Sequence, residues 1–200
     1  MNKMKLNLLG RHLYAGKGGL AALVVAASMT VASSQAMAAV ACFTTPIPVP
    51  QTSAGIYANL FTGLSGVTPA SSPGWDLNFW GAGSAFFWVA ATTPLTGFVD
   101  DGAGVIANLA NSAIVGPASA FLTGNSTPAR MATYHAGVTN GNLGVRFVEG
   151  ANTYYAWVNV TTTAPAGLPV TINRWCYENT PATAITVGTT PVSLQKFSVD

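Results

Sequence analysis

The sequence predicts an all-β protein, an antiparallel β-sandwich of jelly-roll-like form with one short helix at residues 106–114. Three observations lead to this prediction. Short runs that are apolar or alternate in polarity recur roughly every ten residues. Glycine, proline and asparagine separate these runs, as they do in turns. Half of the residues are hydrophobic and only 7% are charged, which is typical of a folded domain rather than a disordered chain.

The first 38 residues are predicted to be a secretory leader. Four basic residues precede an apolar stretch that ends at residue 32. Ala36-Met37-Ala38 then has the small-x-small pattern of a cleavage site. The stretch is too short for a stable membrane span. We therefore expect a single domain at residues 39–200, exported from a bacterial-type cell to the periplasm, the cell surface or the medium.

Removing the leader reverses the sign of the net charge. The whole chain carries a formal charge of +2, whereas residues 39–200 hold four basic and six acidic residues, a net charge of −2. We therefore expect neither a nucleic-acid partner, which needs a basic surface, nor stable membrane insertion. A polar surface with few charges provides little repulsion between copies, which favours self-association or an adhesive or matrix role.

The strands are expected where apolar or alternating runs occur. These runs are 55–64, 75–80, 85–90, 144–148, 154–160, 170–177, 184–187 and 192–199. Gly81 to Ser84 predicts a hairpin turn between two of them. Residues 42–51 carry prolines at alternate positions, so they are predicted to form an edge strand, or a strand exchanged between copies. Asp100-Asp101-Gly102 predicts a further turn.

Residues 106–114 are the expected helix. Ile106, Leu109, Ala110 and Ala113 follow the i, i+3, i+4, i+7 spacing of one helical face. The segment is only about two turns long, and Gly116-Pro117 would end it.

The two cysteines of the domain are Cys42 and Cys176. An even number of cysteines in an exported protein predicts a disulfide, which would join the start of the domain to a late strand and stabilise it by about 4–5 kcal/mol. Lipidation of Cys42 is the alternative, because residues 39–42 loosely resemble a lipobox. The chain has neither a CxxC spacing nor a neighbouring histidine, so no metal and no cofactor are expected.

Few residues suggest catalysis. His135 is the single histidine after the leader, and a Gly-x-Ser-x-Gly motif is absent, so His135 is interpreted as a solvated or hydrogen-bonded loop residue. A glycoside hydrolase needs two carboxyl groups on either side of the scissile bond. Asp76, Glu149 and Glu178 are the candidates, but their spacing does not indicate a pair. We therefore do not expect an enzyme, and a carboxylate-dependent glycoside hydrolase is the less favoured alternative.

Four tryptophans are candidates for stacking on sugar rings: Trp75, Trp80, Trp157 and Trp175. They would form such a platform if several lay exposed on one face. The alternative is that they belong to the core, as Trp88 does by the pattern of its own apolar run.

Charged residues inside strand motifs are expected to pair, because a buried charge is costly without a partner. Arg146 is predicted to pair with Glu178, and Arg174 and Glu149 are the alternative partners.

Three motifs in the second half of the chain occur in a distinctive order. They are Leu143-Gly144-Val145-Arg146-Phe147, Tyr154-Tyr155-Ala156-Trp157-Val158 and Cys176-Tyr177-Glu178-Asn179-Thr180-Pro181, followed by Ile185 and Gly188. This region, from Gly116 to Gly188, resembles the LGxRF, YYGWxxV and AYExTP pattern of secreted bacterial β-sandwich proteins of the PEP-CTERM-associated type. The resemblance implies a β fold and export, and it implies no catalytic residues. The sorting tail and the Asp-rich segment of that type do not occur here, and Ala156 replaces the usual glycine.

Together these observations predict a secreted, non-enzymatic protein with a structural, adhesive or extracellular-matrix role, able to associate with itself. A carbohydrate-binding module that uses surface aromatics is the alternative, with an extracellular glycan as its partner.

Overall fold

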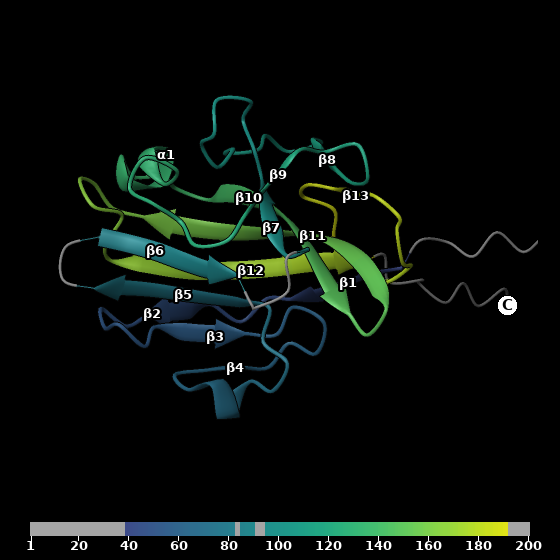
Figure 1. Cartoon of the computed structure of the whole chain (residues 1–200), viewed down its shortest axis with the longest axis horizontal. Coiled ribbons are helices and arrows are strands. Elements are labelled where there is room, and N and C mark those ends of the chain that lie inside the picture. Colours follow the sequence, from purple (N-terminus) through teal and green to yellow (C-terminus); the bar gives the residue numbers. More distant parts are fainter. Residues whose placement is uncertain (1–38, 83–84, 91–94, 192–200) are drawn as a thin grey trace, which may run out of the picture. The chain divides into compact units, whose positions relative to one another are not determined.

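Two antiparallel sheets pack face to face in the computed structural model, which describes residues 39–82, 85–90 and 95–191 (Figure 1). The larger sheet has the order β1-β12-β11-β10-β7-β9, and β2 also pairs with β12. The smaller sheet has the order β4-β3-β5-β6, and β8 and β13 form a separate pair. The predicted all-β, sandwich-like class is confirmed.

The strands of the larger sheet are β1 (Val40–Phe43), β2 (Ile47–Val49), β7 (Gly97–Val99), β9 (Phe121–Thr123), β10 (Gly141–Glu149), β11 (Asn152–Thr162) and β12 (Val170–Glu178). Those of the smaller sheet are β3 (Ile56–Ala58), β4 (Ser65–Gly66), β5 (Leu77–Ala82) and β6 (Ala85–Ala90). The separate pair is β8 (Ile114–Val115) and β13 (Ile185–Thr186). A 3-10 turn, η1 (Pro69–Ser71), and a short helix, α1 (Ala132–His135), complete the described elements.

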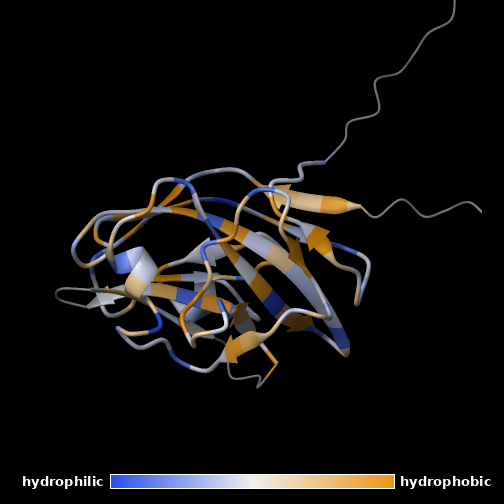
Figure 2. Cartoon of the chain, turned by 90° about the horizontal axis from the view of Figure 1, so that it is seen from above, coloured by the Kyte–Doolittle hydropathy of each residue, from blue (hydrophilic) through white to orange (hydrophobic). Residues whose placement is uncertain are grey.

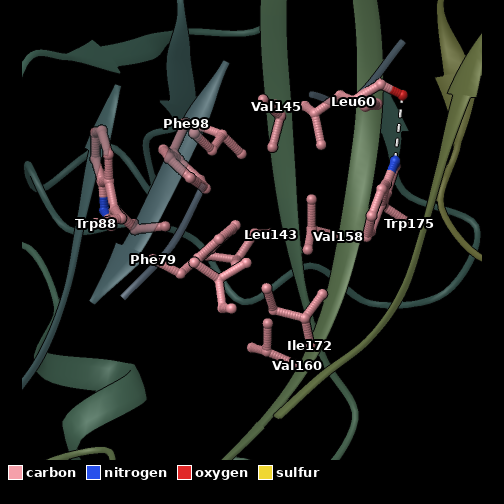
Figure 3. Packing of buried hydrophobic residues seen from close by; sticks show 14 of the residues in the cluster. Leu60, Phe79, Trp88, Phe98, Leu143, Val145, Val158, Val160, Ile172 and Trp175 are labelled. Atoms are coloured by element: carbon pink, nitrogen blue, oxygen red, sulfur yellow. Dashed lines mark hydrogen bonds between the residues drawn. The ribbon is translucent and has the colours of Figure 1, made fainter. Parts of the chain in front are cut away.

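The main hydrophobic core lies between the two sheets (Figure 3). Phe79 and Trp88 reach into it from the smaller sheet, and Leu143, Val145 and Val158 reach into it from the larger one. Each such side chain, when fully buried, stabilises the fold by about 1.5–3 kcal/mol. Side chains of this size on both facing surfaces explain why the two sheets pack together.

The second face of the larger sheet is also covered. Tyr155, Trp157 and Cys176 point to this face and pack against Val115 of β8 and Ile185 of β13 in a second cluster. Figure 2 shows apolar and polar residues alternating along the long strands. Because the larger sheet is buried on both faces over much of its length, β11 carries large aromatics on both sides instead of a polar outer face.

A β-bulge in β12 changes which face its residues point to. Asn159 lies opposite Arg174, but the next residue, Val160, lies opposite Ile172, so Asn173 is the extra residue. Strict alternation would place Ile172 and Arg174 on one face and Trp175 on the other. After the bulge the alternation restarts, so Ile172 and Trp175 both point into the core between the sheets, and Arg174 points to the opposite face.

The predicted helix at residues 106–114 is wrong. Ile106 forms a β-bridge with Asp100, and its N–H donates to the Arg130 carbonyl. Further along, Leu109 N–H donates to Asn142 O, and residue 114 begins β8. An isolated helix of two turns has little stability of its own. Hydrogen bonds to neighbouring segments of the chain therefore form instead of the helical hydrogen bonds. The short helix of this protein is instead α1, in a segment that the sequence pattern did not indicate.

Most predicted strands are confirmed, with different ends. The run at 55–64 is a strand only at β3, whereas the runs at 144–148 and 154–160 extend to the full β10 and β11. The hairpin between β5 and β6 is present, with Ala82 opposite Ala85. The leader at residues 1–38 and the strand expected at 192–199 lie outside the described residues.

The proline-rich segment forms an edge of the larger sheet, as predicted, because β1 and β2 pair only with β12 in the strand order. Pro48 lies opposite Thr171, with Ile47 and Val49 on either side of it. Since proline has no N–H, Ile47 and Val49 must supply the donors to β12, and the outward side of β2 has prolines where donors would otherwise lie.

Within the described ranges, no helix has the length and apolar character needed to cross a membrane.

Candidate functional site

A polar cavity of about 510 Å³ lies at one end of the larger sheet, on the face that carries Arg174. Six residues line it: Thr44, Asn111, Asn140, Asn159, Asn173 and Arg174. We call it the asparagine pocket. Its volume falls in the range of small-molecule sites, roughly 300–1,000 Å³. Four amides, a hydroxyl and one guanidinium supply hydrogen-bond donors and acceptors with a single formal charge.

The floor of the asparagine pocket is a chain of amide hydrogen bonds across the three central strands. Asn159 Nδ2 donates to Asn142 Oδ1 at 2.8 Å, and Asn173 Nδ2 donates to Asn159 Oδ1, also at 2.8 Å. Asn142 and Asn159 are 7% and 4% exposed, so these bonds satisfy amides that would otherwise be costly to bury. Each amide in the chain therefore has one orientation, and the floor is rigid.

The β-bulge gives Asn173 its place in this chain. As the extra residue of β12, its amide also donates to Asn140 Oδ1 at 3.2 Å and to Thr161 Oγ1 at 3.0 Å. Asn140 has a left-handed backbone with φ of 56°, a conformation that asparagine tolerates better than most residues. The Asn140 carbonyl in turn accepts from Asn159 Nδ2 at 2.9 Å. The turn before β10 is thus tied to the floor of the pocket.

Arg174 supplies the charge of the pocket. Its guanidinium carbon lies 5.3 Å from the centre of the Trp157 ring, and the ring is fully buried beneath it. A guanidinium over an indole face is attracted by the electrons of the ring, which holds the side chain in place. Among the described residues the guanidinium donates no hydrogen bond, so its N–H groups are available to a ligand.

The disulfide predicted from the sequence is present and lies beside this site. Cys42 of β1 lies directly opposite Cys176 of β12, with the two Cα atoms 4.1 Å apart. In the antiparallel register, Thr44 and Arg174 each lie two residues beyond a cysteine, so the disulfide holds the edge segment against the strand that carries the arginine. The alternative, lipidation of Cys42, is excluded by the bond.

The loop before β8 closes the pocket with Asn111. A Cβ atom at Gly188 would lie 3.2 Å from Asn111 Oδ1, and Gly188 has a φ of 87°. Both the close approach and the left-handed backbone favour glycine at this position. The Asn111 amide is exposed and forms no hydrogen bond within the described ranges, so it remains free at the rim.

Two of the four tryptophans predicted to stack on sugar rings are buried. Trp157 is fully buried and Trp175 is 2% exposed, so neither can stack on a sugar ring. Trp157 is buried because β8 and β13 cover the second face of the larger sheet. Trp175 is buried because the bulge turns it into the core, where its indole N–H donates to the Leu60 carbonyl at 3.2 Å (Figure 3). Trp75 and Trp80 are half-buried, and Trp75 contacts Tyr57 edge-on at 5.1 Å.

The predicted ion pairs do not form within the described residues, and Arg146 and Glu178 use other partners. Arg146 lies 4.6 Å over the Phe121 ring, and its Nε donates to the Leu95 carbonyl at 2.6 Å. Glu178 is 1% exposed and accepts from the Thr180 N–H at 2.9 Å. Arg146 and Glu178 are on β10 and β12, two strand spacings apart, about 9–10 Å, with β11 between them. Arg174 and Glu149 do not replace them as partners.

Asp76 is the carboxylate with the most unusual environment. It is 3% exposed, and its Oδ2 accepts from the Leu60 N–H at 2.7 Å. Burial raises its pKa from 3.8 to about 7, the Leu60 hydrogen bond opposes this shift, and the like charge of Glu149 adds to it. The structure thus brings Asp76 and Glu149 within electrostatic range. Glu178 follows Cys176 and Tyr177 in alternation and points to the far face of the larger sheet.

His135 ends α1 and is half-buried, and its Nε2 donates to the Phe86 carbonyl at 2.7 Å. This agrees with the hydrogen-bonded interpretation. Asp100 and Asp101 form the predicted turn, in which each side chain accepts two backbone N–H groups. In the part of the chain that the structure describes, no three His, Cys, Asp or Glu side chains are grouped as metal ligands would be.

The pattern of the sequence did not indicate the asparagine pocket. One usable signal was present, because Asn159 and Asn173 each occur inside a predicted strand, where asparagine is disfavoured. A buried amide in a strand needs a partner, and a second such amide on the next strand is the obvious one.

Comparison of the chain with models of protein families, with curated proteins and with solved structures found no match.

Proposed function

We propose that this protein is exported and acts as a non-enzymatic adhesive module that binds an extracellular polysaccharide in the asparagine pocket. The observation that carries the proposal is the chain of fixed amides beneath an open cavity whose rim groups are uncommitted. Sugar hydroxyls both donate and accept hydrogen bonds, and so do amide side chains. The proposal keeps the glycan partner expected from the sequence but replaces the aromatic platform with an amide pocket.

The rigidity of the pocket supports a binding function. Its floor is tied across three strands by amide hydrogen bonds, and the disulfide joins the chain segments that carry Thr44 and Arg174. A preformed site loses little conformational entropy when a ligand binds. A protein that only fills space in a matrix would not need uncommitted polar groups gathered over a fixed floor.

Binding to an array of extracellular polysaccharides tests the proposal, with Thr44→Phe as the variant. Thr44 is exposed at the rim of the pocket and lies after the end of β1, so the phenylalanine ring fills the cavity without breaking the sheet ladder. Thr45→Phe is the matched control, because Thr45 is also exposed and lines the second hollow, of about 360 Å³, together with Thr44, but it does not line the asparagine pocket. We expect the first variant to lose binding and the second to retain it. Equal binding by both variants would refute a function of this pocket.

Self-association through the proline-rich edge has less support. The outward side of β2 has prolines in place of donors, so a second copy would find few N–H groups there. Adhesion through the pocket does not depend on assembly. A monomer in size-exclusion chromatography is compatible with the proposal.

A carboxylate-dependent glycoside hydrolase is a second candidate, favoured by one observation. Asp76 has a pKa of about 7 and lies within electrostatic range of Glu149, and enzymes use an acid of this kind beside a second carboxylate. This candidate is the weaker one, because Asp76 is only 3% exposed and its carboxylate already accepts the Leu60 N–H, which is a structural role. Release of reducing ends from a polysaccharide, abolished in both Asp76→Asn and Glu149→Gln, would establish it.

A further inference from the structure

We propose that the ligand of the asparagine pocket is an acidic polysaccharide, and that Arg174 binds the carboxylate of one of its sugar units. This inference rests on the proposed function and adds the chemical class of the ligand. It starts from the charge of the pocket, whose lining contains one arginine and no acidic residue.

The state of Arg174 differs from that of the other described arginines. Arg130 donates to the Thr123 carbonyl at 2.9 Å, and Arg146 donates to the Leu95 carbonyl at 2.6 Å. Arg174 faces Trp157 and, within the described ranges, donates to no protein group. A contact with the ring leaves the guanidinium without a carbonyl or carboxylate acceptor, and its planar fork fits a carboxylate with two parallel hydrogen bonds.

The neighbours of Arg174 indicate a sugar acid rather than a simple anion. The rim carries Thr44, Asn111 and Asn140, which are exposed and offer a hydroxyl and two amides. Asn140 Oδ1 is used by Asn173, but the Nδ2 of Asn140 forms no bond to a described residue. One cation surrounded by neutral hydrogen-bonding groups matches a sugar ring that has one carboxylate and several hydroxyls.

A peptide with acidic side chains is the less suitable occupant. A peptide that binds a β-protein usually adds its backbone to a strand edge or places side chains in apolar pockets. The lining of this cavity is polar throughout, so it offers no apolar pocket to a peptide side chain, and the two strands that contribute to it, β11 and β12, are already paired on both sides.

The test is calorimetric titration of the purified, disulfide-bonded protein with oligogalacturonate and with its methyl-esterified form. These two probes differ only in the charge and hydrogen-bonding of the carboxyl group. We expect the acid to bind at least tenfold more tightly than the ester, with an affinity that falls as salt is added. Arg174→Gln should weaken binding of the acid at least tenfold, and Arg174→Lys should give an intermediate loss, since lysine keeps the charge but not the planar fork.

Two further variants separate the pocket from effects on folding or on net charge. Asn111→Asp adds one negative charge at the exposed rim with almost no change of shape, so it should weaken binding of the acid several-fold and leave unfolding in urea unchanged. Arg130→Gln removes a positive charge outside the pocket and should leave binding unchanged. An equal loss in Arg130→Gln and Arg174→Gln would overturn the assignment of Arg174.

The outcomes distinguish this inference from the proposed function. If the ester or a neutral glycan binds as tightly as the acid, the acidic ligand is wrong and glycan binding stands. If no glycan binds, both proposals fail. If polyglutamate binds as tightly as oligogalacturonate and depends equally on Arg174, the pocket recognises carboxylates in general and the polysaccharide is wrong.

Discussion

Replacing Asp76 with asparagine should make the protein more stable above neutral pH. Asp76 immediately precedes β5 and is 3% exposed. Its Oδ2 accepts the N–H of Leu60 at 2.7 Å. Burial is the main cause that raises its pKa, from 3.8 to about 7, and the negative charge of Glu149 contributes in the same direction. An asparagine oxygen can accept the same N–H without carrying a charge.

The sign and size of the effect follow from proton linkage. Between pH 3.8 and about 7 the folded protein holds the Asp76 proton while the unfolded chain has lost it, so the free energy of unfolding falls as the pH rises. The contribution of this group is fully present below pH 3.8 and is lost as the pH passes about 7. With about 1.4 kcal/mol for each unit of pKa, the loss amounts to about 4 kcal/mol.

The free energy of unfolding is measured by urea unfolding, followed by tryptophan fluorescence, at a series of pH values from about 4 to about 8. This is roughly the range in which Asp76 titrates in the unfolded or the folded protein. We expect wild type and Asp76→Asn to be equally stable near the acidic end and to diverge by about 4 kcal/mol at the alkaline end. Asp101→Asn is the control, because it removes one carboxylate from an exposed turn and makes the same change in net charge. Two parallel stability curves for wild type and Asp76→Asn would refute the reasoning.

Three further predictions concern the asparagine pocket, the disulfide beside it and Gly188, and each is measured by urea unfolding. Asn159→Leu removes the donor to Asn142 Oδ1 and one of the acceptors of Asn173 and should cost about 2–3 kcal/mol, whereas Asn111→Ala at the exposed rim should change stability by less than about 0.5 kcal/mol. Replacing Cys42 and Cys176 with alanine opens a loop whose ends are 134 residues apart and should cost about 3–5 kcal/mol; no loss would mean the cross-link is dispensable. Gly188→Ala places a side chain at a φ of 87° and should cost about 1–2 kcal/mol, while an unchanged stability would show that this loop relaxes freely.

The sequence could predict the class of the fold because its strands are marked by local chemistry. Proline at alternate positions marked the edge segment, and Asp100-Asp101-Gly102 marked a turn that the structure contains. The helix at 106–114 failed for a non-local reason. Its periodicity was correct for a helix, but its backbone groups bond to residues such as Arg130 and Asn142 that are distant in the sequence. Spacing within a segment carries no information about such partners.

The candidate site was harder to predict because it depends on one inserted residue. Without the bulge at Asn173, alternation would place Trp175 on the same face as Asn173 and leave it free to be exposed. The bulge sends Trp175 into the core and Arg174 to the opposite face, so one irregularity removes a predicted ligand-stacking residue and places the arginine of the pocket. Bulges are set by pairing with the neighbouring strand, which the sequence of β12 alone does not reveal.

The low charge of this protein and the character of its pocket have a common explanation. Where a chain has few charges, an arginine is satisfied by the electrons of an aromatic ring instead of a carboxylate, as Arg174 is by Trp157. A carboxylate partner would occupy the hydrogen-bonding edge of the guanidinium, whereas the ring occupies only its face. Within the described residues Arg174 forms no ion pair, which is consistent with the anionic ligand proposed for it. An acid on the rim of the pocket that Arg174 lines, as in Asn111→Asp, should repel the carboxylate of the proposed ligand, with a loss of affinity and no loss of stability.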